Sequence, residues 1–307
     1  MRIVFSIFIL VILGAFTTVP ADVKFEYVFK KGDRYEIRQV TKQLMKQTIM
    51  GSDQNFDNSF SAEYSFLVAE STPTGGKIEV RYAKLKNELK SMMINSSMDS
   101  EGSAETMENK IFKSVINKPF FVYVNKRGEI EKIEGVENLW TDLGTLGLDE
   151  NTQKMLKQNL QQQIFGEASL SATLSQMLVT YSDKAVKQGS KWEVSTAFPI
   201  GFPVKIHDSW SVDEITGANA FLTSDGIATS DKEQTIEVQG GIKAKADLSG
   251  RQARKANVNV KSGWPTKSEI LSEMKGTLTL LKGGMIQEDM EVPMEVTSEI
   301  TFDITKK

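Results

Sequence analysis

Residues 290–304 read Met-Glu-Val-Pro-Met-Glu-Val-Thr-Ser-Glu-Ile-Thr-Phe-Asp-Ile, and this alternation of apolar and polar residues predicts one long β-strand. Apolar residues stand at the even positions, where Ser298 is the only polar interruption. At roughly 3.3 Å per residue the strand would run about 50 Å, whereas typical strands have about five to six residues. Such a strand is typical of a strongly twisted, curved sheet or a half-barrel. Pro293 cannot donate a ladder hydrogen bond, so we expect an edge or a bulge there.

Shorter segments repeat the two-residue period and predict a mainly β protein built from long antiparallel strands. Within residues 35–44 the apolar positions change from odd to even numbers after Ile37, which predicts a β-bulge. The segments with this alternation are residues 25–29, 35–44, 60–68, 78–82, 120–133, 242–248 and 256–260.

The middle of the chain, at residues 135–183, lacks the two-residue period and is apolar at helical spacing. Gly166 is expected to separate or kink two helices, and the polar residues 91–109 are expected to form a mobile loop. The predicted organisation is a signal peptide at 1–21, a β-rich half at 22–134, a helical segment at 135–183 and a second β-rich half at 184–307. Similar glycine turns open the two halves, at Gly32 and Gly189, which indicates that the halves are related.

The first 21 residues have the order of a secretory signal peptide. Arg2 precedes an apolar run at residues 3–13, and small residues lead up to Ala21. The apolar run is too short to span a bilayer comfortably, and no later segment resembles a transmembrane helix. We therefore expect cleavage after Ala21, a periplasmic or secreted location, and no transmembrane segment in the mature chain.

Composition excludes several kinds of chemistry. The chain contains no cysteine, so disulfides, thiolate metal sites and cysteine nucleophiles are ruled out. Its 37 Lys and Arg residues are interleaved with 40 Asp and Glu residues, and no basic block is dense enough for a nucleic-acid-binding face. One histidine, His207, supplies too few ligands for a zinc site. We therefore expect no metal, no cofactor and no nucleic-acid partner.

No catalytic motif stands out, and we assign no catalytic residue. A Ser-His-Asp triad would need His207, but in a strand His207 and Asp208 point to opposite faces. A pair of carboxylates would suffice to hydrolyse glycosidic bonds, yet the 40 acidic residues give no basis for choosing a pair. A glycosidase-like enzyme is therefore the third of three interpretations.

Three segments resemble a known family. They read Phe-Lys-Lys-Gly-Asp-Arg-Tyr at 29–35, Gly-Lys-Ile-Glu-Val-Arg-Tyr at 76–82 and Lys-Ala-Val-Lys-Gln-Gly-Ser-Lys-Trp at 184–192. These turn-and-strand motifs are similar to those of exported bacterial proteins of unknown function that are common in the Bacteroidetes. The resemblance covers most of the mature chain and implies a bacterial origin and an exported location. It implies no activity and no catalytic residues.

The leading hypothesis is a non-enzymatic binding protein that holds an apolar ligand, such as a lipid or acyl chain, between the sheet and the helices. A curved sheet with one apolar face needs a cover, and the helical segment is the obvious one. Methionines on apolar strand faces either fill the core or line an adaptable cavity. The alternative is a structural or protein-interaction role in the cell envelope without a small ligand. The candidate ligand-binding residues are Leu156, Leu160, Ile164, Leu170, Leu174, Met177, Met274, Met290 and Met294.

Overall fold

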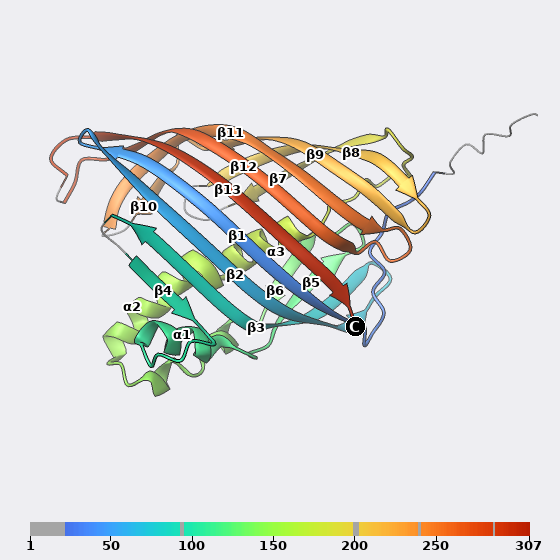
Figure 1. Cartoon of the computed structure of the whole chain (residues 1–307), viewed down its shortest axis with the longest axis horizontal. Coiled ribbons are helices and arrows are strands. Elements are labelled where there is room, and N and C mark those ends of the chain that lie inside the picture. Colours follow the sequence, from blue (N-terminus) through green and yellow to red (C-terminus); the bar gives the residue numbers. More distant parts are fainter. Residues whose placement is uncertain (1–21, 93–94, 199–202, 239–240, 285) are drawn as a thin grey trace, which may run out of the picture.

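The computed structural model describes residues 22–307, apart from residues 93–94, 199–202, 239–240 and 285. The predicted signal peptide lies outside the described residues. The chain is mainly β, as expected, and its strands form one large, open antiparallel sheet of 13 strands (Figure 1). In the described part of the chain, no helix has the length and apolar character that crossing a bilayer requires.

Both predicted β-rich segments contribute strands to this sheet. The first contributes β1 (Arg34–Ile49), β2 (Ser52–Ser71), β3 (Gly75–Ser91), β4 (Asn95–Asp99), β5 (Phe120–Asn125) and β6 (Ile130–Glu134). The second contributes β7 (Lys191–Phe198), β8 (Val204–Thr216), β9 (Asn219–Ser230), β10 (Thr235–Val238), β11 (Ile242–Asn259), β12 (Pro265–Leu280) and β13 (Met290–Lys306).

The strand order is β6-β5-β3-β2-β1-β13-β12-β11-β9-β8-β7, with β4 paired to β3 and β10 paired to β11. Each half is a meander of hairpins, and the halves meet where β1 pairs with β13. The first and last strands of the chain therefore lie at the centre of the sheet, and β6 and β7 lie at its edges.

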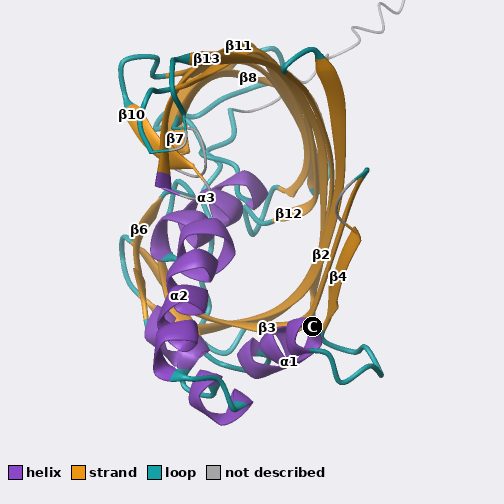
Figure 2. Cartoon of the chain, turned by 90° about the vertical axis from the view of Figure 1, so that its left-hand side faces the viewer, coloured by secondary structure: helices purple, strands orange, loops and turns teal. Residues whose placement is uncertain are grey.

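A helical segment connects these two edge strands. It consists of η1 (Val136–Trp140), η2 (Leu143–Leu146), α2 (Glu150–Leu160), the π-helical turn η3 (Gln161–Phe165) and α3 (Glu167–Met177). Gly166 separates η3 from α3, as predicted. Figure 2 shows the strands curling around most of an oval, with α2 and α3 on the side where β6 and β7 lie. Because α3 contacts both β6 and β7, it closes the gap between the two edges of the curled sheet.

The structure confirms that β13 has one inner and one outer face. Val292, Met294, Phe302 and Ile304 are buried on the inner face, and their odd-numbered neighbours are exposed or half-buried. Pro293 pairs with Thr277 of β12 and lies just beyond the last residue that β13 pairs with β1. This part of β13 is therefore a local edge, as the proline predicted. The middle of the inner face, at residues 296–300, is only half-buried.

The predicted bulge in β1 is wrong. Its pairing with β2 and β13 continues without a shift of register from Tyr35 to Gln47. The inner face of β1 therefore changes from apolar to polar along an unbroken strand, at Gln39, Thr41 and Gln43. The apolar pattern of β1 predicted a bulge, but its backbone is hydrogen-bonded to neighbours on both sides. This pairing keeps the strand regular, so the residues that break the apolar pattern stay on the inner face.

The predicted strand at residues 25–29 is an extended segment outside the sheet. Its alternation is real, since Phe25, Tyr27 and Phe29 are all buried. However, its backbone bonds to separate loops: the N–H of Tyr27 donates to the carbonyl of Lys126, and that of Val28 donates to the carbonyl of Ser262. The segment therefore packs across one end of the curled sheet instead of pairing with a strand.

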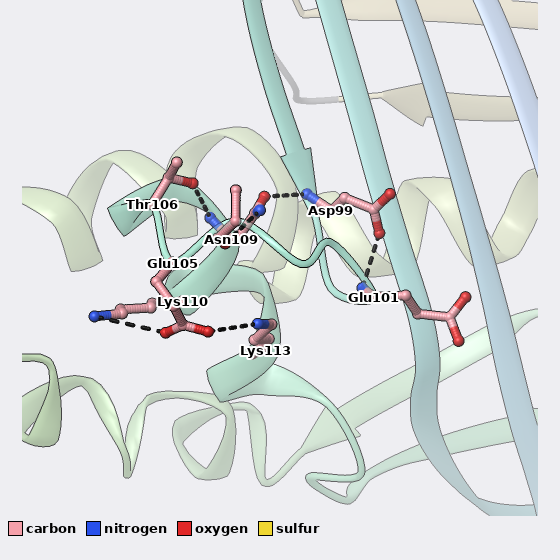
Figure 3. Close-up of polar contacts among 8 residues, drawn as sticks. Asp99, Glu101, Glu105, Thr106, Asn109, Lys110 and Lys113 are labelled. Carbon is pink, nitrogen blue, oxygen red and sulfur yellow. Dashed lines mark hydrogen bonds and ion pairs between the residues drawn. The ribbon is translucent and has the colours of Figure 1, made fainter.

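The expectation of a mobile loop over residues 91–109 is also wrong for its described part. Strand β4 and the start of α1 (Met107–Val115) lie within it. The buried Asn109 ties the connection together (Figure 3): its Oδ1 accepts a 2.8 Å hydrogen bond from the N–H of Asp99, and its Nδ2 donates to the carbonyl of Ala104. Thr106 caps α1 by accepting a hydrogen bond from the N–H of Asn109. Polar side chains here order the chain by local hydrogen bonding.

Two apolar clusters occupy opposite ends of the inner face. The aromatic end includes Tyr27, Phe29, Tyr35, Tyr181 and Trp264, where the rings of Tyr35 and Trp264 stack with centroids 4.2 Å apart. The methionine end has a buried core of Ala244, Ala246, Leu248, Leu278, Val292 and Met294, joined by the partly buried Met45, Met274 and Met290. Between the two ends, a space remains against β1, β2, β3 and β13.

Candidate functional site

A cavity of about 510 Å³ lies between the inner face of the sheet and the helical segment. Strands β1, β2, β3 and β13 form one wall, and η3 and α3 form the other. Its lining residues are Gln39, Thr41, Gln43, Met45, Phe56, Asn58, Phe60, Tyr64, Tyr82, Asn87, Leu89, Ile164, Thr173, Gln176 and Ile300. None of these lining residues, all of which the structure describes, is Asp, Glu, Lys, Arg or His.

Phe165 positions the helical wall of the cavity. It is fully buried at the end of the π-helical turn, where its ring packs edge-on against those of Tyr82, Phe112 and Trp140. This anchor leaves the preceding residue, Ile164, to line the cavity. Single π-helical turns are rare and recur at functional sites, because they redirect the side chains around them.

Strand register assembles a continuous line of neutral polar side chains across the inner face. Asn58 pairs with Gln43, Gln43 with Ser298, Ser298 with Ser272, and Ser272 with Gln252. We call these five residues the polar row; they come from β2, β1, β13, β12 and β11. On β12 and β13 apolar residues flank the row on both sides, with Ile300 and Ile270 toward the aromatic end and Val296 and Met274 toward the methionine end.

The polar row keeps much of its hydrogen-bonding capacity unused. Gln43 Nε2 donates to Ser298 Oγ at 3.2 Å. The side chains of Asn58, Ser272 and Gln252 have no hydrogen-bond partner among the described residues, although Gln252 is only 4% exposed. None of their polar atoms belongs to the fully buried, unpaired atoms of the described residues, so these groups are accessible from the interior of the sheet. These side chains therefore favour a polar group that enters from within the curled sheet.

Two cavity tyrosines act as neutral hydrogen-bond donors. The hydroxyl of Tyr64 donates to Gln39 Oε1 at 2.6 Å, and Gln39 Nε2 donates in turn to Thr41 Oγ1 at 3.0 Å. Burial raises the pKa of Tyr64 and of Tyr82 well above the ordinary value, because water no longer stabilises the phenolate. The tyrosines at the edge of the cavity therefore carry no charge.

The charged residues on the inner face of the described strands are Arg254 and Asp208, and they pair with each other. Arg254 Nη1 lies 3.8 Å from Asp208 Oδ2, and Ser224 Oγ donates to Asp208 Oδ1 at 3.0 Å. Nη2 of Arg254 donates to the carbonyls of Gln176 and Leu178, at the end of α3. Burial lowers the pKa of the guanidinium, and Asp208 opposes that shift. The pair fixes α3 to β8 and β11, because removing either partner would leave a buried charge uncompensated.

Charge is concentrated on the outer face instead. Lys46 pairs in register with Glu295, and Glu295 with Lys275, so opposite charges face each other across three strands. A hollow of about 780 Å³ on this face, larger than the cavity, is lined by these three residues and by Asp53, Asn55, Ser249 and others. The hollow and the inner cavity are open to solvent to a similar degree, so the two differ in their lining and not in their enclosure. An outer charged face and an inner neutral face are typical of a sheet whose outside contacts water.

The nine candidate ligand-binding residues, all within the described chain, fall into two separate groups. Leu160, Leu170, Leu174 and Met177 are buried in the main core, and Leu156 packs partly buried against it; of the nine, Ile164 alone lines the cavity. Met274, Met290 and Met294 lie in the cluster at the methionine end. The helical residues and the methionines therefore do not share one pocket.

The sequence interpretation missed the polar side of the cavity. Gln39, Thr41, Gln43, Asn58 and Asn87 were not predicted as site residues, because each looks like an ordinary polar position in its own segment. The one local signal was Ser298, the polar interruption of the apolar face of β13.

His207 lies outside the cavity, on the outer face of β8. Ser195 Oγ is 2.8 Å from its Nδ1, and Glu193 Oε2 is 3.3 Å from its Nε2. The side chains of His207 and Glu193 are 61% and 54% exposed, so solvent weakens their interaction. Ser195, His207 and Glu193 have the composition of a catalytic triad, but they lie exposed on the surface instead of in an enclosed site. Asp208 points to the opposite face of β8, as the sequence predicted.

Comparison with known proteins identifies the family but not the activity. A model described as a family of unknown function (DUF6263) matches residues 75–265, and the chain therefore belongs to this family. No curated protein matches the sequence.

Two solved structures resemble the chain weakly. A structure concerned with lipid–protein interactions in lipovitellin aligns with 91% of this chain and 26% of that chain, with a TM-score of 0.48 at 10% identity. This chain thus spans about a quarter of that protein. The COG4313 outer membrane channel from Pseudomonas putida F1 aligns with 92% of this chain and 98% of that chain, with a TM-score of 0.28 at 6% identity.

Proposed function

We propose that this member of the DUF6263 family is a non-enzymatic binding protein that holds a lipid-like small molecule between the curled sheet and α3. The observation that carries the proposal is the cavity itself. Inward-facing side chains at the middle of the sheet, such as Thr41, Gln43 and Ile300, remain partly exposed, although inward-facing residues of the same strands toward the aromatic end, such as Ile37 and Phe302, are buried. A sheet that only had to fold would fill this space, because protein interiors are close-packed.

The dimensions and lining of the cavity support binding. Its volume of about 510 Å³ falls within the roughly 300–1,000 Å³ of small-molecule sites. Phe56, Phe60 and Leu89 offer apolar surface for a chain, and Met45 adds an adaptable thioether. Hydrolysis of a glycosidic bond needs two carboxyl groups at the reacting bond. The described lining residues include no carboxylate, which favours binding over the glycosidase-like alternative.

Export is part of the proposal and rests on the sequence of residues 1–21. We infer that the protein acts in the periplasm or outside the cell, after cleavage behind Ala21. N-terminal sequencing of protein recovered from those fractions tests this. An N-terminus at Asp22 is expected, and an intact Met1 would contradict export.

Two experiments test the binding function. Native mass spectrometry of protein purified from its own envelope should show a co-purifying molecule. The uncharged dye Nile red should also bind the folded protein, and Thr173→Trp, which places a large ring in the cavity, should weaken dye binding about tenfold, or about 1.4 kcal/mol.

The matched control is Gln158→Trp, on the exposed face of α2, which should leave dye binding unchanged. If neither a co-purifying molecule nor dye binding is found, a structural or protein-interaction role replaces the binding role.

A further inference from the structure

We propose that the molecule held in the cavity is an uncharged amphiphile, such as a long-chain alcohol, ester or amide, whose hydrogen-bonding group lies on the polar row. This inference rests on the proposed binding function and adds the chemical class of the ligand. It follows from three features of the inner face: its lack of free charge, its unused hydrogen-bonding groups and the apolar surface on both sides of the polar row.

The first feature is electrostatic. A carboxylate, phosphate or ammonium group inside the curled sheet would lose its hydration and would need a countercharge. The described lining residues offer none. Arg254 and Asp208, the charged pair of the inner face, neutralise each other; Nη2 of Arg254 donates to the carbonyls of Gln176 and Leu178, and Nε alone of its nitrogens has no hydrogen-bond partner among the described residues. A charged head group therefore pays a desolvation penalty here that no protein charge offsets.

The second feature is hydrogen bonding. Each amide of the polar row has both a carbonyl that accepts and an NH₂ group that donates, and each serine hydroxyl does both. Of the polar row, Asn58 and Gln43 line the cavity; among the described residues Asn58 has no hydrogen-bond partner and Gln43 bonds only to Ser298, so both keep free donors and acceptors. A hydroxyl, ester or amide group on a ligand can satisfy them without bringing a charge.

The third feature is the apolar surface that borders the polar row. Phe60 and Ile300 follow it toward the aromatic end, and Phe56 and Met45 follow it toward the methionine end. A polar group seated on the row therefore has apolar walls within reach of any attached chain. This arrangement of a few polar groups in an apolar surround is typical of sites that fix a ligand's orientation.

The first test compares three amphiphiles that share a twelve-carbon chain. Monolauroylglycerol, dodecanoate and dodecyltrimethylammonium are titrated against the Nile red complex at pH 8, where the carboxylate is ionised. Monolauroylglycerol should displace the dye at a concentration at least about tenfold lower than either charged compound, or about 1.4 kcal/mol. Equal or stronger displacement by dodecanoate or by the ammonium compound would overturn the inference.

The second test places substitutions on the two faces of the same strands. Gln43→Leu and Ser298→Ala remove polar groups from the polar row, whereas Lys42→Leu and Thr297→Ala change the outer face at adjacent positions. The first pair should abolish the preference for monolauroylglycerol over dodecanoate, and the outer pair should retain it. A preference that survives Gln43→Leu and Ser298→Ala together would show that the polar row does not select the ligand.

These outcomes separate the two proposals. If wild-type protein binds neither Nile red nor any of the three amphiphiles, the binding function itself fails. If Nile red binds and all three amphiphiles displace it equally, the binding function stands and the uncharged class is wrong. The wild-type comparison decides the class of ligand even if a polar-row variant does not fold.

Discussion

The two ends of the curled sheet are closed by different means. At the aromatic end, Trp264 packs against Tyr27, Phe29 and Tyr35, and the hydroxyl of Tyr181 donates to the carbonyl of Gly263 at 2.6 Å. At the methionine end, the buried core consists of small and aliphatic residues and Met294, bordered by the partly buried Met45, Met274 and Met290. Most rings of the aromatic end come from segments outside the strands, namely residues 25–29, Tyr181 and Trp264, whereas the methionine end is built from strand side chains.

This difference indicates that the two ends of the curled sheet have different roles. Rigid rings with directed hydrogen bonds hold the aromatic end in one arrangement. Methionines adapt their shape at low cost, so the methionine end tolerates change. The cavity and the polar row lie between the two, where the strands are already held in register but the interior is not filled. The predictions below test this difference.

The largest effect is expected from a charge placed on the inner face near the aromatic end. Phe302 is fully buried, so Phe302→Asp should cost more than about 5 kcal/mol and abolish folding. Val296 lies on the same face but is half-buried beside the methionine end, so Val296→Asp should cost about 2 kcal/mol. Urea unfolding measures both changes. Thr301→Lys, on the outer face, is the control and should stay within about 0.5 kcal/mol.

The next effect separates the two ends by truncation. Trp264→Ala removes the ring that joins three aromatic neighbours and should cost about 3–5 kcal/mol. Met274→Ala, at a half-buried position of the methionine end, should cost about 1–2 kcal/mol. Thermal and chemical unfolding give both values. Equal losses would show that the two ends are equally rigid.

A glycine substitution sharpens the description of the methionine end. A Cβ on Gly250 would lie 1.9 Å from the carbonyl oxygen of Glu273 in the neighbouring strand, so the backbones approach too closely for any side chain. Gly250→Ala should therefore destabilise the protein by about 1–3 kcal/mol. Ser249→Ala, at the exposed adjacent position, should be nearly neutral. A neutral Gly250→Ala would mean that the close approach is relieved at little cost by strand movement.

Hydrogen exchange should resolve a smaller difference within the helical segment. Leu170, Leu174 and Met177 bury α3 in the main core, whereas α2 buries little beyond Leu160. Amides of α2 should therefore exchange faster than those of α3, because few buried contacts oppose local opening. Addition of an amphiphile should slow exchange in η3 and α3, which line the cavity. Equal protection of α2 and α3 would contradict this picture.

The smallest effect is expected at His207. Its exposure and its position on the outer face give it no contact with the cavity. His207→Gln should change stability by less than about 0.5 kcal/mol and dye binding by less than about threefold. Loss of binding by two orders of magnitude, with folding intact, would restore a functional role for this side chain.

The sequence by itself determined the strands, the helical cover and the sidedness of β13. These properties are local, because a two-residue period assigns each side chain to a face whatever the strand pairs with. The sequence also located Gly166 between two helices and Pro293 at a local edge. The sequence-based prediction failed at β1 and at residues 25–29. Side-chain alternation did not reveal that β1 pairs with a strand on each side, or that residues 25–29 pair with no strand of the sheet.

Only the tertiary structure decided where the site lies. The polar row joins Gln43 to Ser298, residues 255 positions apart, and no local pattern relates them. Their alignment depends on the register of β1 against β13, and a shift of one residue would turn Gln43 to the outer face. The cavity also depends on tertiary structure. It is the space that remains between the two ends of the sheet, α3 and the π-helical turn η3. The side-chain period can be seen within each segment, whereas register depends on how distant segments pair.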